Sequence, residues 1–315
     1  MSPSGGPGIA FSFALLATVC LALLFPGLFL RWGWFDCRDA ITPLLQFIMF
    51  SMGTRVGLED LRHVVTAPGA VATGLGLQYL AMPFTGAALS SLFQLPADVS
   101  AGVILTGSVC AGNSSNVMTW FSGGNLALSV AMTTLSTLLA PLTTPLFMRI
   151  LASRSVPLDF AALSWSIVRI VVLPLLLGLM CERLLHRHKA QAERWLPGLV
   201  IAATCLVNAI ITAMSRDALL TTGLVLILVA VLHNLAGFVL GYAGARLLRL
   251  QSRDAYAVAM QVGIRNCGLA AGLAYDVLKS SNAALPSVLF GTVQNASGAL
   301  IASYLRKRHA VSTEG

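Results

Sequence analysis

The chain has 315 residues, of which 57% are hydrophobic and only 10% are charged. Soluble domains carry about 25% charged residues, so this chain cannot cover a water-facing surface. Its long uncharged runs differ from the short alternating segments of a β-barrel and predict an all-α polytopic membrane protein. The net charge of +8 is typical of basic loops that fix membrane topology and does not indicate nucleic-acid binding.

Apolar segments separated by charged or turn-rich residues predict ten transmembrane helices. These segments are residues 9–30, 38–56, 66–94, 98–122, 124–150, 160–182, 195–215, 218–246, 254–276 and 282–305. An even number places both termini on one side of the membrane. The loops on that side carry about twice as many basic residues as the opposite loops, which predicts cytoplasmic termini and a cytoplasmic (inner) membrane location.

Two arginines fall within the predicted spans. Arg169 lies near one end of its span, from which its side chain is expected to reach the interface. Arg265 lies deep in its span, where a charge costs on the order of 2.5–3.5 kcal/mol by insertion scales. The nearest acidic residues are Asp254 and Asp276, at the two ends of that span. Arg265 therefore has no side-chain counter-ion, and a charge retained at this depth indicates a functional site.

The fourth and ninth spans share residues at a constant offset: Asp98 with Asp254, Gly107 with Gly263, and Gly112 with Gly268. Because five spans separate the two copies, the second copy is inverted, and the chain divides into repeats at 1–157 and 158–315. Both spans place glycines and polar residues at mid-depth. Such interrupted spans in inverted halves are typical of a transporter's binding site. The alternative is that these glycines only permit close helix packing.

The stretch "GNSSNVMTWFSGGNLALSVAMTTLSTLLAPLTTP" (112–145) closely resembles the bile acid:sodium symporter family, in particular bacterial homologues of its apical sodium-dependent type. The same family is resembled by "LQYLAMP" (77–83), "VLHNLAG" (231–237), "VGIRNCGLAAGLA" (262–274) and "NASGALIASY" (295–304). The resemblance implies ten helices in two inverted five-helix repeats. Spans 3–5 and 8–10 would form a core domain with two discontinuous crossing helices, and spans 1, 2, 6 and 7 a panel domain, with substrate between them.

The resemblance also implies the residues of the sites. One sodium site would use the side chain at 261 together with Ser115, Asn116, Ser129 and Thr133. A second would use the side chains at 261 and 265 with Gln78 and the main-chain carbonyls of Val262 and Ile264. Substrate contacts would come from Asn113, Asn266 and Asn295. Asn208 and His233 match no site of the family and are expected to make hydrogen bonds between helices.

Two of these positions depart from the family pattern. Sodium-coupled members have a glutamate where this chain has Gln261, and a glutamine where it has Arg265. Gln261 keeps a carbonyl oxygen but lacks the charge that offsets cation dehydration, and Arg265 has only donors. Three interpretations follow: Arg265 binds a substrate anion while one sodium site survives, Arg265 replaces sodium altogether, or Arg265 only caps freed carbonyls.

The predicted function is secondary transport of small organic anions by alternating access. The substrate would be a bile acid-like anion or a small carboxylate such as pantoate. The family resemblance implies sodium coupling, and the altered residues Gln261 and Arg265 leave at most one expected Na⁺ site. Alternatives are a sodium-independent uniporter or exchanger, and a ligand sensor that does not transport. An enzyme is not expected, because the chain lacks intramembrane His/Glu clusters and paired aspartates. No cofactor or nucleic-acid partner is predicted.

Overall fold

The computed structural model describes residues 6–54, 67–152, 159–185 and 189–314. The described chain is helical apart from one hairpin of two-residue strands, β1 (Arg31–Trp32) and β2 (Phe35–Asp36). Its helices are α1 (Gly6–Leu24), α2 (Gly27–Leu30), α3 (Ile41–Gly53), α5 (Pro68–Leu92), α6 (Ala97–Ser108), α7 (Asn113–Phe121), α8 (Leu126–Leu151), α9 (Phe160–Ile167), α10 (Leu173–Leu185), α11 (Lys189–Met214), α12 (Arg216–Leu247), α13 (Ser252–Gly263), α14 (Cys267–Asp276) and α15 (Ser281–Glu314). A 3-10 turn, η1 (Cys37–Ala40), precedes α3, and a π-helical turn, η2 (Val168–Val172), joins α9 to α10. The predicted all-α class is confirmed.

Four helical segments of the described residues are long and apolar enough to cross a bilayer. They are Leu126–Leu151, Phe160–Cys181, Trp195–Met214 and Arg216–Leu247, and each matches a predicted span. The lipid-facing character of α12 is plain from its leucines, since Leu224 is 86% exposed. The chain is therefore a multi-pass membrane protein. The full count of ten spans stays a prediction, and the predicted boundary between 157 and 158 lies outside the described residues.

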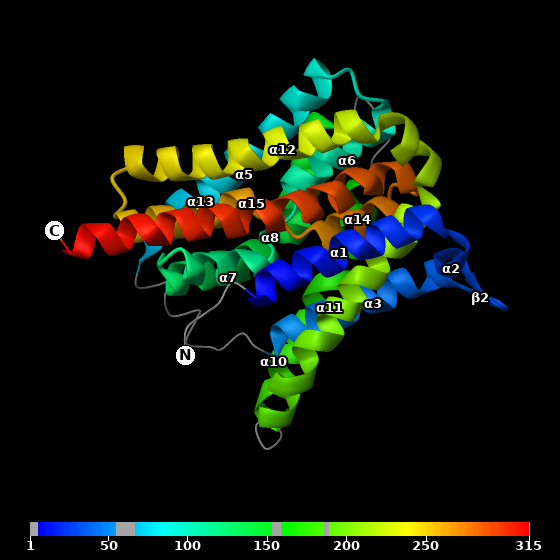
Figure 1. Ribbon diagram of the computed structural model, residues 1–315, viewed down its shortest axis with the longest axis horizontal. Coiled ribbons are helices and arrows are strands. Elements are labelled where there is room, and N and C mark those ends of the chain that lie inside the picture. The colour runs from blue at the N-terminus through cyan, green and yellow to red at the C-terminus, as the bar shows by residue number, and fades with distance from the viewer. Residues whose placement is uncertain (1–5, 55–66, 153–158, 186–188, 315) are drawn as a thin grey trace.

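The helices pack in two groups. Helices α12, α13 and α15 run alongside one another across the upper half of Figure 1, whereas α3, α10 and α11 lie below them. Within the lower group, α3 packs on both α10 and α11, and α1 packs on α11. In the upper group, α5 packs on α6, α8 and α12. An interface lies between the two groups; the division into a panel and a core stays a prediction.

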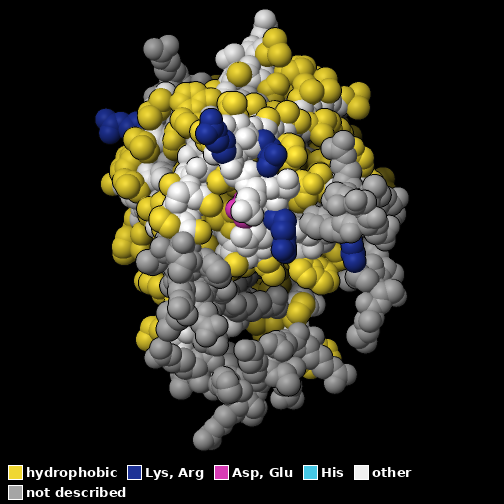
Figure 2. All heavy atoms as spheres, turned by 90° about the vertical axis from the view of Figure 1, so that its left-hand side faces the viewer, with side chains coloured by type: hydrophobic (Ala, Val, Ile, Leu, Met, Phe, Trp, Pro, Cys, Tyr) yellow, Lys and Arg dark blue, Asp and Glu magenta, His cyan; other side chains and the backbone are white. Residues whose placement is uncertain are grey.

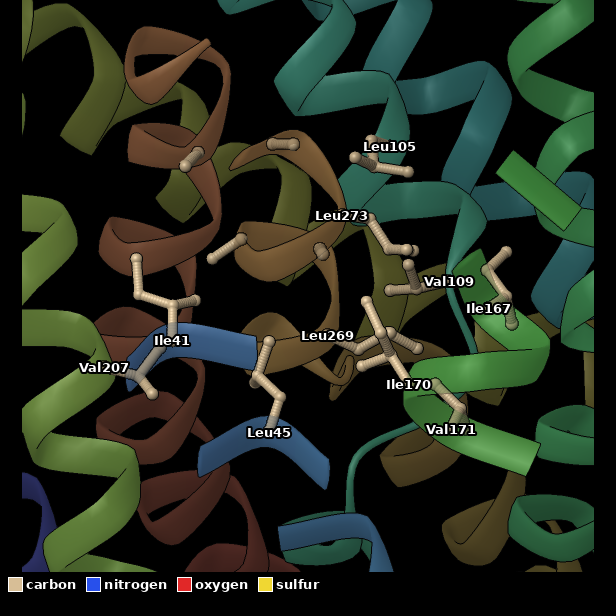
Figure 3. Packing of buried hydrophobic residues seen from close by; sticks show 14 of the residues in the cluster. Ile41, Leu45, Leu105, Val109, Ile167, Ile170, Val171, Val207, Leu269 and Leu273 are labelled. Carbon is tan, nitrogen blue, oxygen red and sulfur yellow. The ribbon is translucent and has the colours of Figure 1, made fainter. Parts of the chain in front are cut away.

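One part of that interface is closed by apolar side chains, shown in Figure 3. We call the buried residues Ile41, Leu45, Ile170, Val207, Leu269 and Leu273 the apolar seal. The first four come from α3, η2 and α11, and the last two from α14. Gly272 of α14 permits the close approach of α3, because a Cβ at this position would overlap the Leu45 side chain. The apolar seal thus joins the two groups through buried apolar contacts at this end.

The opposite end of the molecule is basic. Helix α12 ends, α13 begins and α15 ends on the left-hand side of Figure 1, and Figure 2 shows basic side chains gathered on that face. The exposed arginines at these helix ends are Arg246, Arg249, Arg253 and Arg306. Helix α1 begins on the same side. The basic face and the apolar seal therefore lie toward opposite ends of the helices.

Candidate functional site

The candidate site is built where two interrupted helical segments cross. Helix α6 ends at Ser108 and α7 begins at Asn113, while α13 ends at Gly263 and α14 begins at Cys267. The helix breaks thus fall in the two segments where the sequence predicts them. Mid-span glycines and polar residues interrupt the helices there. The backbone groups freed by each break lie at membrane depth, so they must find partners within the protein.

The two breaks supply each other's backbone partners. Ala111 pairs with Arg265 as an antiparallel bridge. The Gly112 amide donates to the Ile264 carbonyl at 3.2 Å, and the Asn266 amide donates to the Cys110 carbonyl at 3.0 Å. Glycine is needed at 112, since a Cβ there would lie 2.7 Å from the Arg265 carbonyl oxygen. The crossing is therefore an element in which backbone groups of the two breaks pair with each other.

Gln294 of α15 holds the same crossing and was not identified from the sequence. Its Oε1 accepts from the Arg265 amide at 2.7 Å, and its Nε2 donates to the Arg265 carbonyl at 2.9 Å. The amide side chain thus pairs with the peptide as a neighbouring strand would. The sequence does show a glutamine next to Asn295 within a predicted span, which indicates a buried polar contact. It does not show that the partner is the distant Arg265 backbone.

Replacing Gln294 by leucine is expected to destabilise the protein. The change leaves the buried Arg265 amide without its acceptor, at a cost of about 1–3 kcal/mol, whereas the Arg265 carbonyl still accepts from the Cys267 amide at 3.0 Å. The melting temperature of the purified protein in detergent measures the loss. A Thr292→Val variant is the control, because within the described chain the Thr292 hydroxyl bonds only to the Val288 carbonyl of its own helix. Equal melting temperatures for both variants would contradict this role of Gln294.

The Arg265 side chain is buried at the crossing, 1% exposed. Its Nη2 donates to the Gln78 carbonyl at 2.8 Å, and its Nη1 donates to the Val109 carbonyl at 3.2 Å, just after α6 ends. Its Nε has no hydrogen-bond partner in the described chain. No carboxylate of the described residues forms an ion pair with it. The guanidinium therefore bonds to one carbonyl at the end of α6 and one within α5, and its positive charge has no carboxylate partner in the described part of the chain.

A cavity of about 330 Å³ adjoins the crossing. Its wall includes all four residues expected to contact substrate, namely Asn113, Arg265, Asn266 and Asn295. Apolar residues of α1, α3 and α11 complete it, among them Leu15, Met49 and Val200. A mostly apolar wall with a few polar groups is typical of small-molecule pockets.

The polar residues of the cavity wall are only partly engaged within the protein. Asn266 caps α14 by accepting from the Leu269 amide at 3.1 Å, while its Nδ2 has only a long contact of 3.9 Å to the Met49 sulfur. Asn295 Nδ2 donates to the Gly291 carbonyl at 2.8 Å, and its Oδ1 has no partner among the described residues. Helices α7 and α14 both begin in this wall, so their N-terminal amides favour negative charge there.

The two residues left outside the predicted site have different outcomes. His233 bonds through Nε2 to the Met82 carbonyl of α5 at 2.9 Å, which confirms the expected contact between helices. For Asn208 the expectation was wrong, because its Nδ2 donates to the Thr204 carbonyl of its own helix at 2.8 Å. Both Asn208 and Thr204 line the cavity. The four-residue spacing of Thr204 and Asn208 predicts that both side chains lie on one face of α11. It does not predict what that face contacts.

The residues expected at the first sodium site come together, except for one. Asn116 of α7, Ser129 and Thr133 of α8, and Gln261 of α13 form a single hydrogen-bonded cluster. Ser115 instead donates through Oγ to the Gly112 carbonyl at 2.6 Å. This contact belongs to the first turn of α7, so the structure does not bring the Ser115 hydroxyl into the cluster.

The residues expected at the second sodium site lie around Arg265. The Gln78 carbonyl accepts from the guanidinium, and the Ile264 carbonyl already accepts from the Gly112 amide. Val262 is buried in the last turn of α13. Both polar atoms of the Gln78 side chain are buried without a partner in the described part of the chain. Among the described residues, no group of three or more His, Cys, Asp or Glu side chains is placed to hold a metal ion.

Comparison with known proteins agrees with this architecture. The family model described as sodium bile acid symporter family matches residues 42–222. The chain is 37% identical over 302 residues to "Uncharacterized sodium-dependent transporter YocS" of Bacillus subtilis (strain 168), covering 96% of this chain and 92% of that protein. It is 31% identical over 270 residues to "Probable sodium/metabolite cotransporter BASS2, chloroplastic" of Oryza sativa subsp. japonica, covering 86% of this chain and 64% of the relative.

A third relative, "Probable sodium/metabolite cotransporter BASS1, chloroplastic" of Arabidopsis thaliana, is 28% identical over 263 residues, covering 84% of this chain and 66% of the relative. The chain thus spans just under two thirds of the length of these two chloroplast relatives. The matches are to membrane transporters and not to enzymes. With a family match over more than half of its length and a relative aligned almost end to end, the chain belongs to the sodium bile acid symporter family.

Proposed function

We propose that this protein is a secondary transporter of small organic anions in the cytoplasmic membrane. The observation that carries the proposal is Arg265, a residue of the 330 Å³ cavity wall whose guanidinium has no carboxylate partner among the described residues. The N-termini of α7 and α14 add positive potential at the same wall. A cavity of this size lies at the lower end of the usual range of about 300–1,000 Å³. Small carboxylates such as pantoate are therefore favoured over larger, bile acid-like anions.

Transport would proceed by alternating access, with α1, α2, α3, α9, η2, α10 and α11 moving as a panel against the remaining helices as a core. Along α3, Ile41 and Leu45 belong to the apolar seal, whereas Ile48 and Met49 line the cavity. The cavity therefore occupies the half of the interface nearer the basic face. Basic ends face the cytoplasm, so this arrangement supports an inward-facing state with cytoplasmic termini.

Two contacts support the inverted-repeat organisation. Asn125 Nδ2 donates to Asp254 Oδ1 at 2.8 Å, at the start of α13. In the other half, Ser280 Oγ bonds to Asp98 Oδ2 at 3.4 Å, at the start of α6. Each half thus supplies a polar side chain to the aspartate that begins the other half's interrupted helix. Ten spans in two such repeats, divided near residue 157, account for this reciprocity.

Counterflow in proteoliposomes tests the proposed transport. Vesicles preloaded with unlabelled pantoate are expected to accumulate labelled pantoate above protein-free vesicles, with cholate as the bile acid comparison. An Asn266→Asp variant keeps the oxygen that caps α14 but places a negative charge in the cavity wall. The rate of labelled anion counterflow should fall at least about tenfold in this variant, since like charges repel strongly at low dielectric.

The melting temperature of Asn266→Asp shows whether the variant remains folded. Carboxylate that stabilises the wild-type protein without any counterflow would favour a ligand sensor instead. If neither anion binds nor exchanges, the assignment of organic anions to this cavity is wrong. The names of the relatives, as sodium-dependent or sodium/metabolite transporters, support transport as the activity to test first.

A further inference from the structure

The amide nitrogen of Gln261 lies inside a shell of oxygen atoms. Its Nε2 is 2.7 Å from Ser129 Oγ, the Ser129 carbonyl oxygen and Thr133 Oγ1, and 3.0 Å from Asn116 Oδ1. Gln261, Ser129 and Thr133 are fully or almost fully buried. We call these four oxygens with the nitrogen the Gln261 cluster. Oxygen atoms converging on one buried point are what a hard cation requires.

The amide cannot bond equally to all four oxygens, because its nitrogen carries only two hydrogens. The hydroxyl groups also have other acceptors, since Ser129 Oγ and Thr133 Oγ1 donate to Asn116 Oδ1 at 2.7 and 3.0 Å. The shell therefore offers more oxygen atoms than the amide uses. The four oxygens lie around one point, whereas a planar –NH₂ group directs its hydrogens at only two of them.

The orientation of the amide is fixed by its neighbours. The reverse orientation would place the Gln261 oxygen against the Ser129 carbonyl oxygen, which carries no hydrogen and lies 2.7 Å from the present nitrogen position. With the nitrogen inside, Gln261 Oε1 is buried without a hydrogen-bond partner in the described chain. The Gln261 oxygen is thus unpaired in the orientation that places the Gln261 nitrogen within the shell of oxygens.

The charge balance also disfavours a cation in this shell. The four oxygens and the amide are neutral, and no carboxylate belongs to the Gln261 cluster. A cation entering it would lose its hydration without a compensating negative charge. Arg265, four residues further along the chain, is buried and adds repulsion.

We propose that the Gln261 amide permanently occupies a monovalent-cation site, so that the wild-type chain binds no cation in the Gln261 cluster. The residues present do not fit a bound Na⁺, although the family and its relatives are named for sodium. A Gln261→Glu substitution removes the donor nitrogen and adds one negative charge. It should convert the shell into a site for one monovalent cation. The inference concerns cation binding and holds whichever anion the cavity takes.

The test needs no substrate, so its failure is separate from any failure of the transport assay. The melting temperature of the purified protein is measured as NaCl replaces choline chloride at constant ionic strength, with KCl as a second series. The wild-type protein is expected to show no cation-specific change. Gln261→Glu should show a saturable rise of about 3–8 °C at a hundredfold excess of cation over its Kd.

A Gln261→Glu, Thr133→Val double variant is the matched control. It keeps the charge and nearly the same volume but removes one shell oxygen, so its cation response should be weaker than that of Gln261→Glu. Equilibrium binding of ²²Na⁺ to the wild-type protein provides a second measurement that does not depend on a variant folding. Saturable Na⁺ or K⁺ binding by the wild-type protein at this cluster, abolished by Thr133→Val, would overturn the proposal. A folded Gln261→Glu protein without any cation response would overturn it equally.

Discussion

Replacing Arg265 by methionine is expected to weaken anion binding about 30-fold. The guanidinium is the uncompensated charge of the cavity wall, and methionine keeps much of its length without any charge. At an effective dielectric constant of about 20, a full charge acting over roughly 8 Å contributes about 2 kcal/mol, which corresponds to this factor. The Val109 carbonyl, which lies beyond the end of α6, also loses its Arg265 donor, so the variant should be less stable by about 1–3 kcal/mol.

Two comparisons separate the electrostatic effect from the structural effect. Arg265→Lys keeps the charge but cannot reproduce the two-pronged donation to both carbonyls, so it should retain most of the affinity and lose stability. Arg169→Met is the matched control, because Arg169 pairs with Asp276 at 2.9 Å and its side chain is 48% exposed. An exposed pair of this kind contributes about 0.2–1 kcal/mol. Unchanged anion affinity in folded Arg265→Met protein would exclude the proposed role of this charge.

Replacing Gly272 by alanine is expected to open the apolar seal. The added methyl group overlaps the Leu45 side chain, which is itself buried. Overpacking of a close-packed interior costs about 1–3 kcal/mol, and separation of α3 from α14 relieves it. The conformational equilibrium therefore shifts toward a state in which the panel and the core are separated at this end. Transport should fall because the sealed state becomes less populated.

Native Cys37 reports on the opening. It is buried in the same apolar cluster, 1% exposed, and its reaction with a maleimide can be followed after the other five cysteines are replaced. Labelling should be slow in this background and faster after Gly272→Ala. Gly268→Ala is the matched control, because a Cβ at Gly268 would lie at an ordinary 3.5 Å from Leu45. Leu45→Ala should relieve the overlap in a double variant. Equal labelling of the Gly268 and Gly272 variants would disprove the effect.

Much of the scaffold was predictable because its signals are local. The helix breaks follow from glycines and polar residues at mid-depth, and the lack of a carboxylate partner for Arg265 follows from the position of every acidic residue. Asn113, Asn266 and Asn295, which the resemblance implies as substrate contacts, line one cavity together with Arg265. Their roles toward a substrate remain proposals.

The missed contacts are those in which a side chain meets a distant backbone atom or a distant side chain. The carbonyls of Gln78 and Val109 that accept from Arg265, like the Arg265 peptide held by Gln294, carry no side-chain signal. The pairing of Arg169 with Asp276 joins two span ends whose proximity only the packing decides. The inward direction of the Gln261 nitrogen depends on which atoms its neighbours present, which residue identity alone does not specify.

If the side chains of Gln261 and Arg265 take the place of bound cations, the net charge moved in each transport cycle changes. A bound sodium ion would cross the membrane with the substrate, whereas a side chain stays with the protein. If no inorganic cation travels with the substrate, each transported monoanion moves one negative charge across the membrane. A potential of 100 mV changes the free energy of such a step by about 2.3 kcal/mol. In a cell whose interior is negative, this voltage opposes uptake and favours either export of the anion or its one-for-one exchange with another.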